Sequence, residues 1–227
     1  MSKLNLVATP IGNMSDISIR AKEILSNCDI VACEDTRVAS KLMNNLGLHK
    51  EFVVYSDVRE KDNATYLLDK LRAGKEVALI SDAGTPCISD PGFRIVRLCR
   101  QEGIDVVVIP GACAIVSALS ASAMPTNAFL FLGFLPPKTS ARKNCFTKYI
   151  DFEHTLIFYE SVHRIEKFLA DAIEIFGKDR YICVAKELTK IYEKFYIGTI
   201  FQVQEEVKKS AIKGEYVVII APKDFVL

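Results

Sequence analysis

Polar and glycine-rich segments follow four of the apolar runs in the first half of this sequence. They occupy residues 9–13, 34–37, 81–92 and 110–114. Glycine lets the main chain approach a ligand closely, and amides, hydroxyls and carboxylates can bind a polar cofactor. Glycine and proline also simply turn a chain, which is the alternative for any single segment. Together, the four segments predict one binding site.

The segment at 81–92 is the most informative of the four. It holds two Asp, two Pro, two Gly, one Thr and two Ser, whereas a turn between a strand and a helix usually needs only about two to six residues. Its Asp82 could accept a hydrogen bond from a ribose or an ammonium group. No Walker-type ending and no Gly-x-Gly-x-x-Gly run is present, so a phosphate ligand is disfavoured.

Short apolar runs alternate with helix-like stretches before these segments. The runs lie at residues 4–9, 29–34, 52–56, 77–81 and 106–110. This alternation is typical of a mostly parallel, buried sheet, whose ligands bind at the carboxyl ends of the strands. In the first helix, Ser15 or Asp16 is expected to cap the N-terminus. Gly74 and Gly103 are expected to end later helices.

The second half repeats the alternation after Pro125. Strands are expected at 129–134, 155–160, 181–187 and 216–221, with a helix over 162–176. The connections after residue 187 are strand-like or short, which indicates a more mixed sheet. We therefore expect an α/β protein of two αβα domains, residues 1–124 and 125–227.

Composition limits the class of protein. Of 227 residues, 50% are hydrophobic and 25% are charged, which suits a globular chain with a sizeable core. No apolar run approaches the roughly twenty residues that span a bilayer, and no signal peptide precedes the first strand, so a cytoplasmic protein is expected. Seven cysteines without a Cys-x-x-Cys pair and three scattered histidines favour reduced thiols and no metal site.

Six ordered motifs resemble one family. They cover residues 9–13, 34–37, 81–92, 133–136, 158–164 and 185–190. Together they closely resemble the ribosomal RNA small subunit methyltransferase I family, which is part of the tetrapyrrole methylase-like superfamily. The resemblance extends over nearly the whole chain.

This resemblance implies a fold, a reaction and a partner. It implies transfer of a methyl group from S-adenosylmethionine to the 2'-hydroxyl of a cytidine in the decoding region of 16S ribosomal RNA. It also implies a homodimer, with the cofactor in a cleft between two αβα domains. The cofactor-binding residues expected on this basis are Pro10, Asp82, Gly84, Thr85, Ile88, Cys113, Ala114, Phe158 and Tyr159.

The sequence departs from the family in one respect. Members commonly carry a further small helical domain after the strand that corresponds to residues 216–221, and this sequence ends at Leu227. RNA recognition is then expected from the two domains themselves or from the partner subunit.

Methyl transfer from a sulfonium is an in-line displacement, so alignment is the main task of the protein. A ribose hydroxyl also needs a general base. The favoured catalytic residues are Glu187, Asp35 and Lys186, with Glu34 and Glu160 as further candidates. For Asp35 an ordinary ion pair with Arg37 is an equal alternative. His163 is more often a packing residue in such a position, and Cys113 has no nearby histidine to activate it.

Local basic residues are the expected RNA contacts, because the formal net charge is only +1 and provides no general attraction to nucleic acid. A run from 136 to 150 has no acidic residue and carries Lys138, Arg142, Lys143 and Lys148. The other expected contacts are Arg37, Arg164 and Lys190. A solvated helix face is the alternative for the basic run.

Two other functions fit parts of the pattern. A tetrapyrrole methyltransferase of the same superfamily would share the cofactor loops, but residues 34–37 and 186–190 resemble the ribosomal enzymes more. A non-catalytic RNA-binding assembly factor would keep the fold and not bind S-adenosylmethionine.

Overall fold

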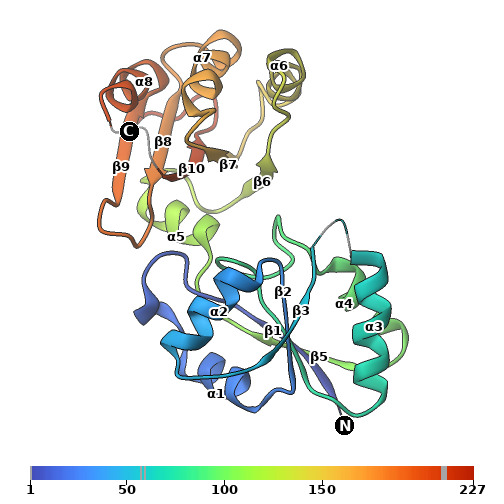
Figure 1. The fold of residues 1–227 in the computed structure, drawn as a ribbon. Helices are drawn as coiled ribbons and strands as arrows, with labels where there is room; N and C mark the ends of the chain where they lie inside the picture. The colour runs from blue at the N-terminus through green and yellow to red at the C-terminus, as the bar shows by residue number, and fades with distance from the viewer. Residues whose placement is uncertain (1, 57, 59, 211–213) are drawn as a thin grey trace. The chain divides into compact units, whose positions relative to one another are not determined.

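The computed structural model describes residues 2–56, 58, 60–210 and 214–227, which form two compact units, Met1–Cys113 and Ala114–Leu227 (Figure 1). The division precedes helix α5 (Ala114–Ala121), whereas the sequence placed the boundary near residue 125. Ile115, Ala118 and Leu119 of α5 are buried, and the helix contacts strand β10 of the second unit. Apolar burial therefore assigns α5 to the second unit.

The first unit contains a five-stranded sheet in the order β3-β2-β4-β1-β5, and each pair of neighbours is parallel. Its strands are β1 (Lys3–Val7), β2 (Ile30–Cys33), β3 (Glu51–Val54), β4 (Val77–Leu79) and β5 (Asp105–Ile109). Every strand overlaps an apolar run of the sequence, which confirms the predicted parallel sheet.

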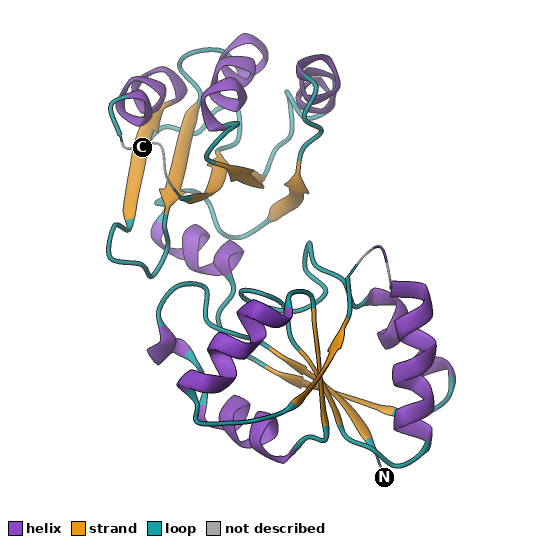
Figure 2. Ribbon diagram, in the orientation of Figure 1, coloured by secondary structure: helices purple, strands orange, loops and turns teal. Residues whose placement is uncertain are grey.

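Helices cover both faces of this sheet (Figure 2). Helices α1 (Ile19–Asn27) and α2 (Thr36–Asn45) pack on one face, and α3 (Glu60–Arg72) and α4 (Phe93–Gln101) pack on the other. Each helix turns a stripe of apolar side chains toward the strands, which is how an amphipathic helix lowers its free energy.

The start of α1 differs from the sequence prediction. The hydroxyl of Ser18 caps this helix by accepting a hydrogen bond from the amide of Ala21 at 3.0 Å. Ser15 and Asp16 instead lie in a short 3-10 helix, Met14–Asp16, one turn earlier. Gly74 and Gly103 have positive φ angles of 88° and 68°, as expected for glycines that end helices.

The second unit has a mixed sheet in the order β6-β7-β10-β8-β9, in which only β6 and β7 pair in parallel. Its strands are β6 (Phe129–Phe134), β7 (Thr155–Ser161), β8 (Tyr181–Lys186), β9 (Lys194–Thr199) and β10 (Glu215–Ile220). The mixed pairing confirms the prediction, but β9 and helix α8 (Ile200–Lys208) were not individually predicted. A capping box between Thr199 and Gln202 begins α8.

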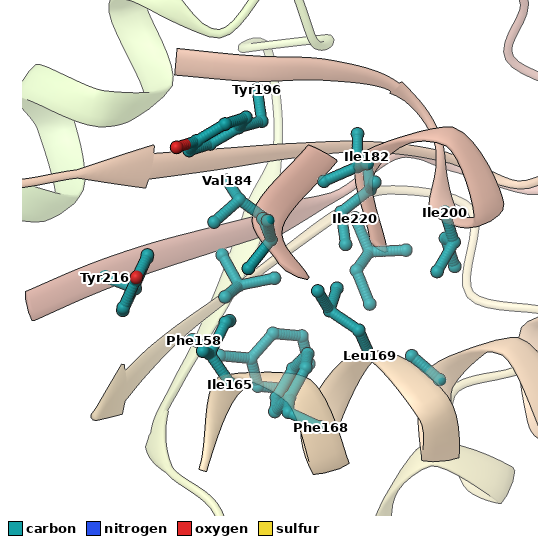
Figure 3. Close-up of a cluster of buried hydrophobic side chains, with 14 of the residues drawn as sticks. Phe158, Ile165, Phe168, Leu169, Ile182, Val184, Tyr196, Ile200, Tyr216 and Ile220 are labelled. Carbon is teal, nitrogen blue, oxygen red and sulfur yellow. The ribbon is translucent and has the colours of Figure 1, made fainter. Parts of the chain in front are cut away.

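Helices α6 (Thr139–Thr147), α7 (Ile165–Phe176) and α8 cover one face of the second sheet around a core that includes Phe158, Phe168 and Val184 (Figure 3). Alternate strand residues such as Ile157 and Cys183 are buried as well, and because neighbours in a strand point to opposite faces they lie on the other side. The unit is therefore an αβα layer, as predicted. Among the described residues, no helix is long and apolar enough to cross a membrane.

Candidate active site

Hydrogen bonds join the segments that follow β1 and β4 at the carboxyl edge of the first sheet. The amide of Thr9 donates to the carbonyl of Gly84 at 2.9 Å, and the amide of Gly84 donates back to Thr9 at 3.1 Å. The Thr9 hydroxyl also donates to the carbonyl of Ser81 at 3.2 Å. Two segments more than seventy residues apart are thus joined in one surface.

The segments after β5 and β2 join the same surface. The Thr85 hydroxyl donates to the carbonyl of Ala112 at 3.2 Å, and the amide of Asp35 donates to Asp82 Oδ1 at 3.2 Å. The structure therefore brings together all four segments that the sequence singled out. We call this surface the loop cluster: residues 9–13, 34–37, 81–92 and 110–113.

The longest segment of the loop cluster is wound tightly. Gly84 has a φ of 88°, and Cys87 and Ser89 adopt positive φ angles of 70° and 62°, which cost free energy in residues other than glycine. A Cβ on Gly92 would lie 2.4 Å from the Cys87 sulfur. The winding leaves Ile88 40% exposed, an apolar side chain available to a ligand.

Two carboxyl groups of the loop cluster, those of Asp35 and Asp82, have pKa values that are shifted in opposite directions. Hydrogen bonds from the side chain and amide of Arg37 lower the pKa of Asp35 to about 2. Burial raises the pKa of Asp82, and the hydrogen bond from the Asp35 amide only partly opposes this. Asp35 is also the N-cap of α2. The structure thus gives Asp35 an ion pair and a capping role, and neither excludes catalysis.

The second unit separates the two aromatic residues predicted to contact the cofactor. Phe158 is fully buried and packs edge-on against Phe146 and Phe168, with ring centroids 5.8 and 5.4 Å away. The side chain of Phe158 therefore belongs to the core, which leaves only its main chain for the predicted contact with the cofactor. Tyr159 points to the other face, where its ring lies 4.9 Å from that of Phe131.

Glu187 and its neighbours form a second polar group, at the end of β8. Glu187 Oε1 accepts hydrogen bonds from Lys190 Nζ at 2.9 Å and from the amide of Glu215 at 3.1 Å. Partial burial raises the pKa of Glu187, but these donors and the nearby lysine charges outweigh it, so the net pKa is lowered. Lys186 is only 6% exposed, with its Nζ 6.0 Å from the centre of the Tyr216 ring.

The basic run on α6 is not a uniform patch. Arg142 is 1% exposed and its Nε donates to Asp171 Oδ2 at 2.8 Å, so its predicted contact with RNA is wrong. Lys143 pairs with Glu174, whereas Lys138 and Lys148 are exposed. Only part of the run is therefore available to a phosphate.

Arg164, another expected RNA contact, lies outside this run. It donates a hydrogen bond to the buried carboxylate of Glu160 at 3.1 Å.

A pocket of about 140 Å³ opens beside the loop cluster in the first unit. Pro10 and Asp82 line it together with one face of α2, which the sequence analysis did not single out. The exposure of the apolar Val38 on that helix marks the pocket in the structure, but the sequence alone does not reveal it. In the described part of the chain, no group of His, Cys, Asp or Glu could hold a metal ion.

Comparisons with known proteins agree with this architecture. Residues 3–204 match the family described as tetrapyrrole (corrin/porphyrin) methylases. A ribosomal RNA small subunit methyltransferase I from Haemophilus influenzae is 46% identical over 222 residues, which cover 97% of this chain and 78% of that protein.

Solved structures share the fold at low sequence identity. A diphthine synthase superposes with a TM-score of 0.76 at 15% identity, covering 99% of this chain and 92% of the other. A uroporphyrin-III C-methyltransferase from Thermus thermophilus, complexed with S-adenyl homocysteine, gives a TM-score of 0.64 at 17% identity and 97% coverage of both chains.

Proposed function

Because the chain belongs to the tetrapyrrole methylase family, and within it to the ribosomal RNA small subunit methyltransferase I proteins, we propose that it methylates small-subunit ribosomal RNA. The donor is S-adenosylmethionine, and the acceptor is the 2'-hydroxyl of a cytidine in the decoding region. The enzyme works in the cytoplasm as a homodimer. The hydrogen-bonded loop cluster is the observation that carries this proposal, because it presents polar and apolar groups suited to such a donor.

The loop cluster fits the chemical groups of S-adenosylmethionine. Glycines with positive φ let the main chain approach closely, Ile88 offers an apolar surface to an adenine, and the Asp82 carboxylate can accept from a hydroxyl or an ammonium. The residues that would hold it are Pro10, Asp82, Gly84, Thr85, Ile88, Cys113, Ala114 and Tyr159. When bound, the sulfonium supplies an electrophilic methyl group.

Glu187 is the proposed general base. Its pKa is lowered, so the carboxylate is ionised at neutral pH and can accept the ribose proton, while Lys190 holds it in place. The charge of the buried Lys186 also lowers the pKa of Glu187 and so favours its ionised form. Asp35 is the weaker candidate, since Arg37 donates to both of its carboxylate oxygens. The proposed phosphate contacts are Arg37, Lys138, Lys143, Arg164 and Lys190.

Two measurements test the proposal. Titration calorimetry should detect binding of S-adenosylmethionine, and incubation of small ribosomal subunits with methyl-labelled donor should label one ribose, located by mass spectrometry of the digested RNA. Binding without labelling of RNA would favour a small-molecule acceptor. Absence of binding would favour a non-catalytic assembly factor.

A further inference from the structure

The pocket beside the loop cluster is built from three parts of the first unit. Helix α2 contributes Val38, Leu42 and Asn45, spaced by four and then three residues so that they share one face. Met14 closes one side, and Pro10 and Asp82 connect the pocket with the loop cluster. Gly84, Thr85 and Ile88 of the proposed cofactor site do not line it. The pocket therefore adjoins the proposed cofactor site and shares Pro10 and Asp82 with it, while the α2 face belongs to the pocket alone.

The walls of the pocket suit a flat ring. Met14 and Val38 are 38% and 36% exposed, although large apolar side chains gain free energy when they are covered. Thioether sulfur also contacts aromatic rings favourably. A volume of about 140 Å³ exceeds the roughly 10–15 Å³ that one water needs, so the space is large enough for a ligand bigger than a few waters.

The polar groups of the pocket suit a nucleobase. The Asn45 side-chain amide can both donate and accept a hydrogen bond, as the polar edge of a nucleobase requires. Lys41 lines the pocket, and its ammonium group can pair with a phosphate on either side of a base. Arg37, one turn earlier, is paired with Asp35.

We propose that this pocket takes one nucleobase of the RNA strand, turned out of its stack, through Asn45 and the apolar walls of Met14 and Val38. The inference rests on the proposed function, since it concerns how the same substrate is held. An enzyme that acts on one nucleotide must fix it against its neighbours, and holding the base outside the stack does so. A base fixed in this way limits the positions that its ribose hydroxyl can reach.

Adjacent asparagines provide a matched test. Asn45 lines the pocket and Asn44 does not, although both are exposed on α2. Asn45→Ala should lower kcat/KM for small ribosomal subunits about tenfold, the effect of losing one hydrogen bond, and leave the Kd for S-adenosylmethionine unchanged. Asn44→Ala should match the wild type in both measurements. Equal kcat/KM for the two variants would overturn the proposal.

A variant that fills the pocket distinguishes between a nucleobase and the cofactor as its occupant. Val38→Phe places a ring in the space and should abolish methylation of subunits while calorimetry still detects the cofactor with unchanged affinity. A weakened Kd for S-adenosylmethionine would show that the pocket holds the cofactor, and the proposal would fail. Circular dichroism confirms that the variant is folded.

A binding measurement tests the pocket even if the protein does not methylate subunits. Cytidine monophosphate, added at millimolar concentration to isotope-labelled protein, should shift the amide resonances of residues 38–45, and Val38→Phe should remove those shifts. Shifts elsewhere, or none, would overturn the proposal for the pocket. Inactivity on subunits together with shifts at α2 would overturn only the choice of ribosomal substrate.

Discussion

Arg142 of α6 donates from Nε to Asp171 Oδ2 of α7 at 2.8 Å, and only 1% of the arginine side chain and 9% of the aspartate side chain are exposed. The guanidinium also donates to the carbonyl of Pro137 and to the hydroxyl of Thr139. Arg142 therefore joins two helices and the segment before α6. Its contribution is to stability, although its position in a basic run resembled an RNA contact.

Replacement of Arg142 by alanine should destabilise the protein by about 3 kcal/mol, because the buried Asp171 carboxylate loses its closest partner and keeps only Lys143, at 3.9 Å, among its ion-pair partners in the described residues. Lys148→Ala is the matched control from the same basic run, since Lys148 is exposed, and it should change stability by less than about 0.5 kcal/mol. Urea unfolding followed by circular dichroism measures both.

The double variant Arg142→Met, Asp171→Leu sharpens this test. Replacing both partners by apolar side chains removes the unpaired charge, so much of the lost stability should return. If the single variant were as stable as Lys148→Ala and only weakened binding of RNA, the structural role of Arg142 would be refuted.

Gly92 should be indispensable for the shape of the loop cluster. A Cβ there would lie 2.4 Å from the Cys87 sulfur and 2.9 Å from Leu79 Cδ2, at a φ of 143°, so Gly92→Ala must displace the segment. We expect at least a tenfold weaker Kd for S-adenosylmethionine by calorimetry, an effect of about 1.4 kcal/mol.

Gly103 provides the control for Gly92. It also has a positive φ, of 68°, but a Cβ there would meet nothing within 4 Å. Gly103→Ala should therefore cost about 1 kcal/mol of stability and leave cofactor affinity unchanged. Equal affinities in the two variants would mean that the segment at 81–92 does not shape the cofactor site.

Much of the fold could be predicted because its signals are local. Apolar runs specify buried strands, and glycines such as Gly74 and Gly103 end helices. The position of the loop cluster follows from a general property of parallel sheets, whose strands all end at one edge. These predictions did not require knowledge of any contact between distant residues.

The errors in the site required such knowledge. The partner of Arg142 is Asp171 on another helix, and no local pattern identifies it. Phe158 and Tyr159 are neighbours in one motif, yet one enters the core and the other does not, because alternate residues of a strand face opposite sides. The pocket on α2 was missed because Met14 and Asn45 come together only in the folded unit.

The two roles of Asp35 can be separated by Asp35→Asn. Asparagine is as good an N-cap as aspartate but has no charge and cannot act as a base. If Glu187 is the base, this variant should keep kcat within about threefold of the wild type, whereas loss of a general base costs about a hundredfold or more. A hundredfold loss of kcat in labelled-methyl assays would transfer the role to Asp35.

The same variant has a defined pH dependence. The folded-state pKa of Asp35 is about 2, below its ordinary value of 3.8, so the ionised carboxylate stabilises the fold above the ordinary value. That stabilisation is lost as the pH falls through the folded-state pKa. The difference in Tm between wild type and Asp35→Asn should therefore shrink as the pH falls from about 4 to about 2. A difference independent of pH would mean that the Asp35–Arg37 pair does not affect stability.

Glu187→Gln tests the proposed general base directly. Because the pKa of Glu187 is lowered by Lys190 and the Glu215 amide despite partial burial, its carboxylate should stay ionised, and kcat should not fall between about pH 8 and pH 6. The variant should lose about a hundredfold to ten-thousandfold in kcat. Glu215→Gln is the control, since Glu215 also binds Lys190, at 3.0 Å, but its side chain is 78% exposed; it should stay within about twofold. Equal rates for the two variants, or an acid limb near neutral pH that disappears in Glu187→Gln, would contradict the assignment of an ionised Glu187 as the base.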